Sequence, residues 1–141
     1  MPGARVAHGL LEIMNLMGIH EVEKEDYLHR RFSYPVYTQV KGADLYGHKQ
    51  TGSYNRIDFH EHPDQYKCKF LPYAAQTHIL MNGVYWDKNV PRLFEKEDAR
   101  SENFIIQTIA DITDDANGSV PINTGDQSIA DPIYGIDKNT L

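Results

Sequence analysis

The first part of the chain switches from a helical to a strand-like hydrophobic pattern. Between Arg5 and Met17 the apolar residues recur at helical spacing, namely Val6, Leu10, Ile13, Met14 and Met17. Gly18 follows at the point where a left-handed cap ends a helix. Residues 19–23 alternate apolar and polar positions, which predicts a strand, and residues 23–28 begin with acidic side chains, which predicts a short helix. A helix followed by a strand favours an α/β domain.

The middle of the chain carries a weaker pattern. Residues 33–56 are rich in Tyr, Gly, Ser, Thr and His, and only residues 36–40 alternate as a strand would. We interpret residues 33–60 as a loop-rich insertion with one strand and a mobile loop around residues 47–52. Pro63 and Asp64 then suit the first turn of a helix, which we expect to continue to about Leu71.

Two buried strands are predicted in the last part of the chain. Residues 77–81 form a short apolar run that ends at Asn82 and Gly83, and residues 104–112 form another that leads into a polar loop. A helix from Pro91 to Ala99 is expected to join them. Ligands bind at the carboxyl ends of the strands in an open α/β sheet, so this edge is the candidate site. No strand precedes the helix that starts near Arg5.

Together these patterns predict one partial nucleotide-binding domain over residues 1–141. Its fold class is α/β, as an incomplete doubly wound, Rossmann-like parallel sheet that lacks its first strand and carries a loop-rich insertion.

Composition and charge narrow the function classes. The 141 residues carry a net charge of −6, which opposes nucleic-acid binding through counterion release. Cys68 is the single cysteine, which excludes an internal disulfide framework and suits a reducing compartment. No apolar run approaches the roughly 18 residues of a membrane span, and no signal-peptide pattern is present. We therefore expect a soluble, cytoplasmic protein; its oligomeric state is left open.

A glycine-containing segment opens the first predicted helix. Gly3 and Gly9 flank Arg5 and Val6, and glycines at the start of a helix let a pyrophosphate approach its positive end. An acidic residue about 20 positions later grips the ribose hydroxyls in such sites, and Glu21 or Glu23 has this spacing. A tight turn without any ligand is the competing interpretation. His8 in this segment could approach a phosphate or simply be exposed at the start of the helix.

Several motifs occur in one order along the chain: Arg5-Val6-Ala7-His8-Gly9, His62-Pro63-Asp64-Gln65-Tyr66, Asn82-Gly83-Val84-Tyr85-Trp86, Pro91-Arg92-Leu93 and Asp111-Ile112-Thr113-Asp114-Asp115. With them the chain resembles the cofactor-binding domain of the saccharopine dehydrogenase and lysine-ketoglutarate reductase family over nearly its whole length. The related alanine dehydrogenase and transhydrogenase group matches these motifs less well.

The resemblance implies an oxidoreductase that uses NAD or NADP and acts on an amino acid in lysine metabolism. The residues that it implies are Gly3, Arg5, Val6 and Gly9 at the pyrophosphate, Glu23 at the ribose, Asn82 and Gly83 beside the ribose or nicotinamide, and Asp111 as the catalytic residue. An acid at Glu23 favours NAD, because it repels a 2′-phosphate.

The chain also departs from the family pattern. Ala4 stands where the family has a second glycine, and the N-terminal domain that supplies the catalytic lysine and histidine in the family is absent from this sequence. One hypothesis is therefore a cofactor-binding portion that is inactive without a complementary N-terminal domain, which would also have to complete the amino-acid site. The other is a non-catalytic nucleotide-binding or interaction module derived from the same family.

Two residue groups invite a metal interpretation that we do not favour. His60 and His62 flank Glu61 without an evident third ligand. The acids Asp111, Asp114 and Asp115 could bind a cation or form an acid/base pair, although neighbouring acids in loops are usually solvated. We therefore predict no metal site.

Overall fold

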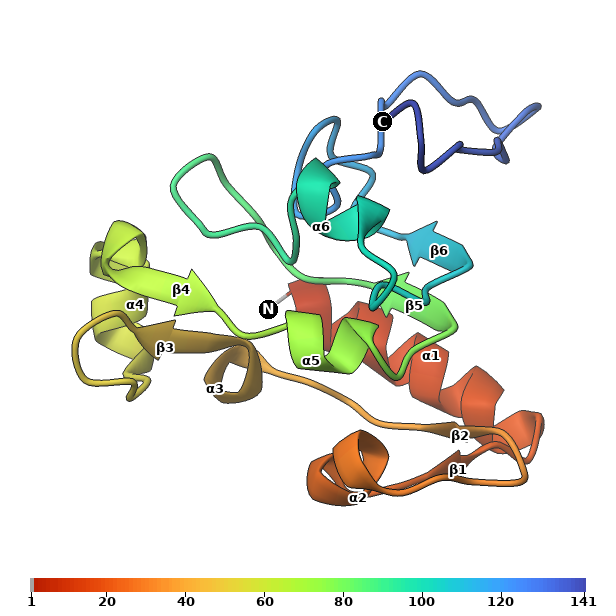
Figure 1. Ribbon diagram of the computed structural model, residues 1–141, viewed down its shortest axis with the longest axis horizontal. Helices are drawn as coiled ribbons and strands as arrows, with labels where there is room; N and C mark the ends of the chain where they lie inside the picture. The colour runs from red at the N-terminus through yellow and green to blue at the C-terminus, as the bar shows by residue number, and fades with distance from the viewer. Residues whose placement is uncertain (1) are drawn as a thin grey trace.

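Two separate pairs of parallel strands form the α/β part of the protein (Figure 1). The computed structural model describes residues 2–141. Its elements are α1 (Pro2–Leu16), β1 (His20–Glu21), α2 (Lys24–His29), β2 (Val36–Tyr37), α3 (Gly42–Leu45), β3 (Tyr46–His48), α4 (Arg56–Glu61), a 3₁₀ turn (Pro63–Gln65), β4 (Tyr66–Cys68), α5 (Leu71–Ala74), β5 (Ile79–Asn82), α6 (Lys96–Arg100) and β6 (Thr108–Asp111). The predicted α/β class, with short parallel sheets, is confirmed.

The first helix forms where the hydrophobic spacing places it. Its end is fixed by Gly18, which adopts a φ of 69°, and by the Ile19 amide, which donates to the Met14 carbonyl at 3.0 Å. Helix α1 already begins at Pro2, a residue whose fixed φ suits the first helical position. Gly3 and Gly9 therefore lie inside the helix, and the expected glycine turn is not formed by residues 3–9.

Each parallel pair follows a strand–helix–strand path. In the first, β1 and β2 flank α2, and His20 and Glu21 face Val36 and Tyr37. In the second, β5 and β6 flank α6, and their register runs from Ile79 opposite Thr108 to Asn82 opposite Asp111. The strands are shorter than predicted. The two predicted as buried are also partly exposed, with Ile79 and Met81 of β5 and Thr108 and Ala110 of β6 exposed.

Strand β6 begins at Thr108 and not at Phe104 as predicted, because the first apolar residues of the predicted strand pack into the hydrophobic core. Phe104 and Ile106 are buried outside the ladder, and pairing with β5 begins where the Thr108 amide donates to the His78 carbonyl. The predicted helix from Pro91 also begins late. Glu95 caps α6, since its backbone amide donates to the Asp98 carboxylate at 2.7 Å, and the Leu93 amide donates instead to the Ser119 carbonyl.

The middle of the chain differs most from the sequence prediction. Strands β3 and β4 form an antiparallel pair, with Tyr46 opposite Cys68. The predicted helix over residues 63–71 is wrong: only a 3₁₀ turn forms, and β4 follows because Tyr66 is buried while Lys67 is exposed, a period of two. Strand β3 likewise occupies the start of the segment predicted as a mobile loop.

The hydrophobic core lies between this middle unit and helices α5 and α6. Aromatic side chains dominate it, and Tyr46 stacks on Phe59 with ring centroids 4.5 Å apart. Its buried members are Leu45, Tyr46, Phe59, Tyr66, Phe70, Tyr73, Ala74, Leu80, Leu93, Phe94, Ala99, Phe104, Ile106 and Val120. None of the side chains from Arg5 to Leu16 is buried. No helix within residues 2–141 is long and apolar enough to cross a membrane.

Candidate functional site

The carboxyl ends of β5 and β6 meet in a buried polar network. Asn82 ends β5 and is 1% exposed, and its amide nitrogen donates to Asp111 Oδ1 and to Ser119 Oγ, both at 2.8 Å. The Asn82 amide oxygen accepts from the Val84 backbone amide at 3.2 Å. Asn82 thus joins both strand ends to the loop that follows β6, as the parallel arrangement predicted.

Asp111 is the hub of this network. Its Oδ1 accepts from Asn82 and from the Thr113 hydroxyl at 2.8 Å, and its Oδ2 accepts from the Asn123 amide at 2.9 Å. Both carboxylate oxygens therefore hold the loop in place. The assignment of Asp111 as a catalytic residue stays a prediction.

The loop after β6 has a defined backbone. Asp114 and Asn117 adopt φ values of 50° and 52°, which their short polar side chains tolerate better than most. The Asn117 amide donates to the Asn123 carbonyl at 2.8 Å, and the Asn123 amide group also reaches Asp114 Oδ1 at 3.2 Å. The loop is thus folded back on itself beside Asp111.

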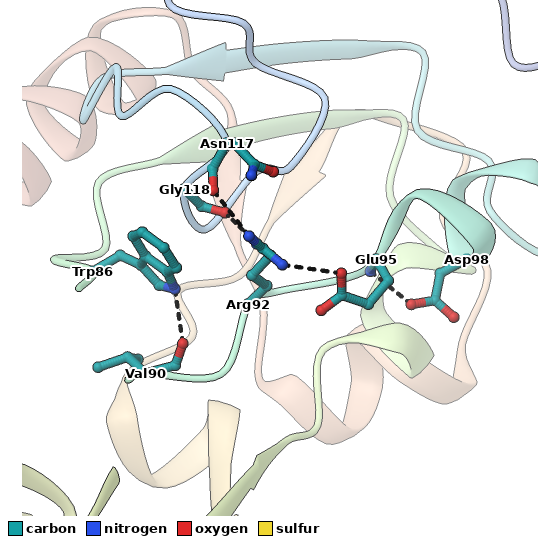
Figure 2. A network of polar contacts seen from close by, with 7 residues as sticks. All are labelled: Trp86, Val90, Arg92, Glu95, Asp98, Asn117 and Gly118. Carbon is teal, nitrogen blue, oxygen red and sulfur yellow. Dashed lines mark hydrogen bonds and ion pairs between the residues drawn. The ribbon is translucent and has the colours of Figure 1, made fainter. Parts of the chain in front are cut away.

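Arg92 fastens the same loop to the segment after β5 (Figure 2). Its Nε donates to the Gly118 carbonyl and its Nη2 to the Asn117 carbonyl, both at 3.2 Å, while Nη1 pairs with Glu95 at 3.3 Å. The guanidinium carbon lies 5.6 Å from the centre of the Trp86 ring. A planar fork can make these contacts at once, which a lysine cannot.

A cavity of about 300 Å³ opens at this edge of the sheet. It is lined by Val6 from α1, by Gly83, Tyr85 and Trp86 after β5, and by Ile112, Thr113 and Asp115 after β6. A β-carbon at Gly83 would lie 2.9 Å from Val6 Cγ1, closer than side chains normally approach. Gly83 therefore lets the first turns of α1 sit against the end of β5.

The structure brings together only some of the predicted site residues. Val6 and Gly83 line the cavity. Asn82 and Asp111, which directly precede the lining residues Gly83 and Ile112, are hydrogen-bonded to each other. Gly3 lies in the first turn of α1, and Arg5 and Gly9 are exposed on that helix. Glu23 is exposed and directly precedes α2, after the Val22 amide extends the β1–β2 pairing by donating to Tyr37. It thus lies at the carboxyl end of β1.

The metal candidates do not assemble. No group of three or more His, Cys, Asp or Glu side chains capable of holding a metal forms within residues 2–141. His60 lies in the last turn of α4, and His62 leads into the 3₁₀ turn, as its position before Pro63 indicated. Burial raises the pKa of the Cys68 thiol to about 11, so this cysteine is protonated at neutral pH and a poor nucleophile.

Sequence reasoning missed Arg92, Ser119 and Asn123 as members of the network. Arg92 stood inside a family motif, which was the available signal. Asn123 gave none, because its role depends on a loop reversal over residues 113–123 that no local pattern predicts.

Curated proteins with similar sequences share one name. The mouse (Mus musculus) alpha-aminoadipic semialdehyde synthase, mitochondrial, is 26% identical over 161 aligned positions that cover 96% of this chain. The bovine (Bos taurus) protein of the same name is 31% identical over 68% of the chain, and the Arabidopsis thaliana alpha-aminoadipic semialdehyde synthase 30% over 57%. The chain is a homologue of these synthases. The resemblance to the saccharopine dehydrogenase and lysine-ketoglutarate reductase family is thereby confirmed.

This homologue corresponds to a small part of its relatives. It spans 17% of the length of the mouse protein, 11% of the bovine protein and 8% of the Arabidopsis protein. No protein-family model matches the chain.

Proposed function

We propose that this chain is the nucleotide-binding portion of a saccharopine dehydrogenase-like oxidoreductase, which uses NAD or NADP and acts on an amino acid. The observation that carries the proposal is the cavity formed by Val6, Gly83 and Thr113 at the carboxyl edge of β5 and β6, in a homologue of alpha-aminoadipic semialdehyde synthases. Its volume of about 300 Å³ is at the small end of ligand pockets and suits one half of a dinucleotide.

The residues around the cavity fit such a ligand. Gly83 lines the cavity, and its lack of a side chain lets α1 pack close enough for Val6 to line the same cavity. Helix α1 starts at this edge and carries no acidic side chain in its first turn, which favours an anionic group there. When bound, a nicotinamide nucleotide supplies hydride transfer, and the protein contributes position and electrostatics.

The polar network at the ends of β5 and β6 has a positioning role. Asn82 and Asp111 fix the two strand ends, and Arg92 fixes the loop that supplies Thr113 and Asp115 to the cavity wall. Because these contacts exist before any ligand arrives, the wall is ordered in advance and binding costs less conformational entropy. We propose that the chain does not turn over substrate by itself.

Glu23 is the residue that we assign to cofactor choice. Its place at the carboxyl end of β1 suits acceptance from ribose hydroxyls, and its charge opposes a 2′-phosphate. Equilibrium dialysis with NAD⁺ and NADP⁺ tests the proposal. We expect weak binding with NAD⁺ preferred, a preference that Glu23→Gln reduces and that Glu25→Gln, in the next exposed position of α2, leaves unchanged. Binding of neither nucleotide at millimolar concentration would remove the proposal.

A non-catalytic interaction module is the second candidate. It is favoured by Asp111, whose two carboxylate oxygens are occupied by three hydrogen bonds within the loop network. Under this candidate the cavity binds no nucleotide, and the same dialysis experiment decides between the two.

A further inference from the structure

We propose that Ser33 is a phosphorylation site for a protein kinase that selects arginine three and two residues before its serine. Three observations carry this inference: the charge pattern before Ser33, the exposure of its segment, and the scarcity of contacts that hold the segment in place. None of the residues involved lines the cavity at β5 and β6, so the inference is independent of nucleotide binding.

The sequence before Ser33 has the charge pattern of a kinase substrate. Arg30 and Arg31 lie three and two positions before Ser33, and the ring of Tyr34 follows it. Kinases that select such serines read the charge of the flanking residues with carboxylates in their peptide groove, and a guanidinium pairs with a carboxylate through two parallel hydrogen bonds. No other serine or threonine of the chain has arginine at both of these positions. The pattern therefore distinguishes Ser33 from every other hydroxyl of its kind in the sequence.

The segment that carries Ser33 is open to solvent. It connects α2 to β2 and runs along the edge of the molecule in the view of Figure 1. Arg30, Arg31 and Ser33 are all exposed, and Tyr34 is 53% exposed. A kinase can therefore reach the serine hydroxyl and both guanidinium groups without unfolding the core.

Aromatic contacts occupy one side of this segment. The Arg30 guanidinium carbon lies 5.6 Å from the centre of the Phe32 ring. The Phe32 ring centre is 6.0 Å from that of Tyr34, which in turn lies 5.9 Å from the His20 ring on β1. Alternate residues thus share one side of the chain, as they do in an extended segment. Ser33 lies between two of them, so its hydroxyl is on the side without these contacts.

Few polar contacts hold the segment in its present shape. In the part of the chain that the structure describes, no main-chain hydrogen bond involves residues 31–34. The Arg30 side chain pairs with Asp26 at 3.6 Å, but the two side chains are 65% and 44% exposed, and exposed ion pairs are weak. Segments with few hydrogen bonds open most readily in folded proteins. A kinase can therefore draw these residues into its groove at little cost.

The modification transfers the γ-phosphoryl group of ATP to the Ser33 hydroxyl. A bond from Ser33 Oγ to phosphorus forms as the bond from phosphorus to the ADP oxygen breaks, and the hydroxyl proton passes to a carboxylate of the kinase. The product carries a charge of about −1.5 to −2 at pH 7. Phosphorylation therefore places a new negative charge in the connection that leads into β2.

Phosphorylation of the folded full chain tests the inference. The probe is the catalytic subunit of cyclic-AMP-dependent protein kinase, an arginine-selecting kinase, with ATP and peptide mass spectrometry. We expect one phosphate, located on Ser33 and absent from Ser33→Ala. Arg31→Ala should lower the initial rate by about tenfold or more, because hydrogen bonds to a charged group are worth at least that factor. Arg100→Ala, in the last turn of α6, should leave the rate unchanged.

A second substrate separates the effect of the sequence from that of the fold. A synthetic peptide of residues 27–37 has the same charge pattern without the folded protein, and we expect the kinase to modify both. Modification of the peptide but not of the folded chain would overturn the inference, because the segment would then be inaccessible. Phosphate on Tyr34 or Ser101 in place of Ser33, an unchanged rate for Arg31→Ala, or no phosphate on either substrate would also overturn it.

Discussion

Asn82 and Asp111 are joined twice, as register partners of β5 and β6 and through a side-chain hydrogen bond of 2.8 Å. The second link places a buried amide and a carboxylate at the point where both strands end. This hydrogen bond holds the two strand ends together. The cavity opens at the same edge, and Arg92 binds the loop that follows β6 there.

Asn82→Ala should destabilise the protein by about 2 kcal/mol, because Asp111 and Ser119 lose the donor that they share in a buried site. Urea unfolding followed by Trp86 fluorescence measures the loss. Asn89→Ala is the matched control, since Asn89 is exposed and only its backbone amide is bonded. Equal effects of the two substitutions would contradict a structural role for the Asn82 side chain.

Arg92→Lys should loosen the loop after β6 while leaving the fold intact. A lysine can replace one of the contacts to Asn117, Gly118 and Glu95, but not all three together. We expect faster hydrogen exchange at Leu93, whose amide donates to Ser119, and no change at Phe59 in α4. Arg100→Lys, on the exposed end of α6, serves as control. An unchanged Leu93 amide would show that the loop is held without Arg92.

Tyr46→Phe and Tyr66→Phe should act in opposite directions. Tyr46 is 3% exposed, and its hydroxyl has no hydrogen-bond partner among the described residues, so its removal should stabilise the fold by about 1 kcal/mol. The stacking on Phe59 is kept. Tyr66→Phe should destabilise it, because the hydroxyl donates to Asp58 at 2.7 Å. Thermal unfolding of both variants measures these two changes in stability. A lower unfolding temperature for Tyr46→Phe would mean that the Tyr46 hydroxyl has a hydrogen-bond partner in the folded protein.

Cys68 should make the protein less stable in alkaline solution. Burial raises the pKa of its thiol from 9.0 to about 11, so the folded state keeps a proton that the unfolded state loses. The stability is complete below pH 9 and falls between pH 9 and 11 by up to about 1.4 kcal/mol per pH unit. Unfolding free energies at pH 8 and pH 10 should differ more for the natural chain than for Cys68→Ala. Parallel curves for the two proteins would contradict the raised pKa.

Local hydrophobic periodicity predicted the elements that it directly controls. Helix α1 and its end at Gly18 follow from apolar spacing and one glycine. Strands β5 and β6 form within the two predicted apolar runs, although neither strand is fully buried. The predicted helix over residues 63–71 failed because Tyr66 and Cys68 are defined by pairing with β3, about twenty positions earlier in the chain. Long-range pairing overrode a local helix signal from Pro63 and Asp64.

The site was predictable where residues follow strand ends directly. Asn82, Gly83 and Asp111 lie at the carboxyl edge because parallel strands bring their ends together. Asn123 was not predictable, since it reaches Asp111 only after the loop reverses through two residues with positive φ, Asp114 and Asn117. The expected glycine turn likewise depended on where α1 begins, and the helix starts at Pro2.

Nuclear magnetic resonance of the ¹⁵N-labelled chain during titration with NAD⁺ tests the central claim most directly. The account predicts progressive shifts of the Gly83, Thr113 and Asp115 amides, which line the cavity, with Ile129 and Gly135 unaffected as distant controls. The Gly83→Val variant should lose these shifts, because its side chain would clash with Val6 and displace the cavity wall. Shifts confined to other parts of the chain, or none at millimolar NAD⁺, would contradict the account.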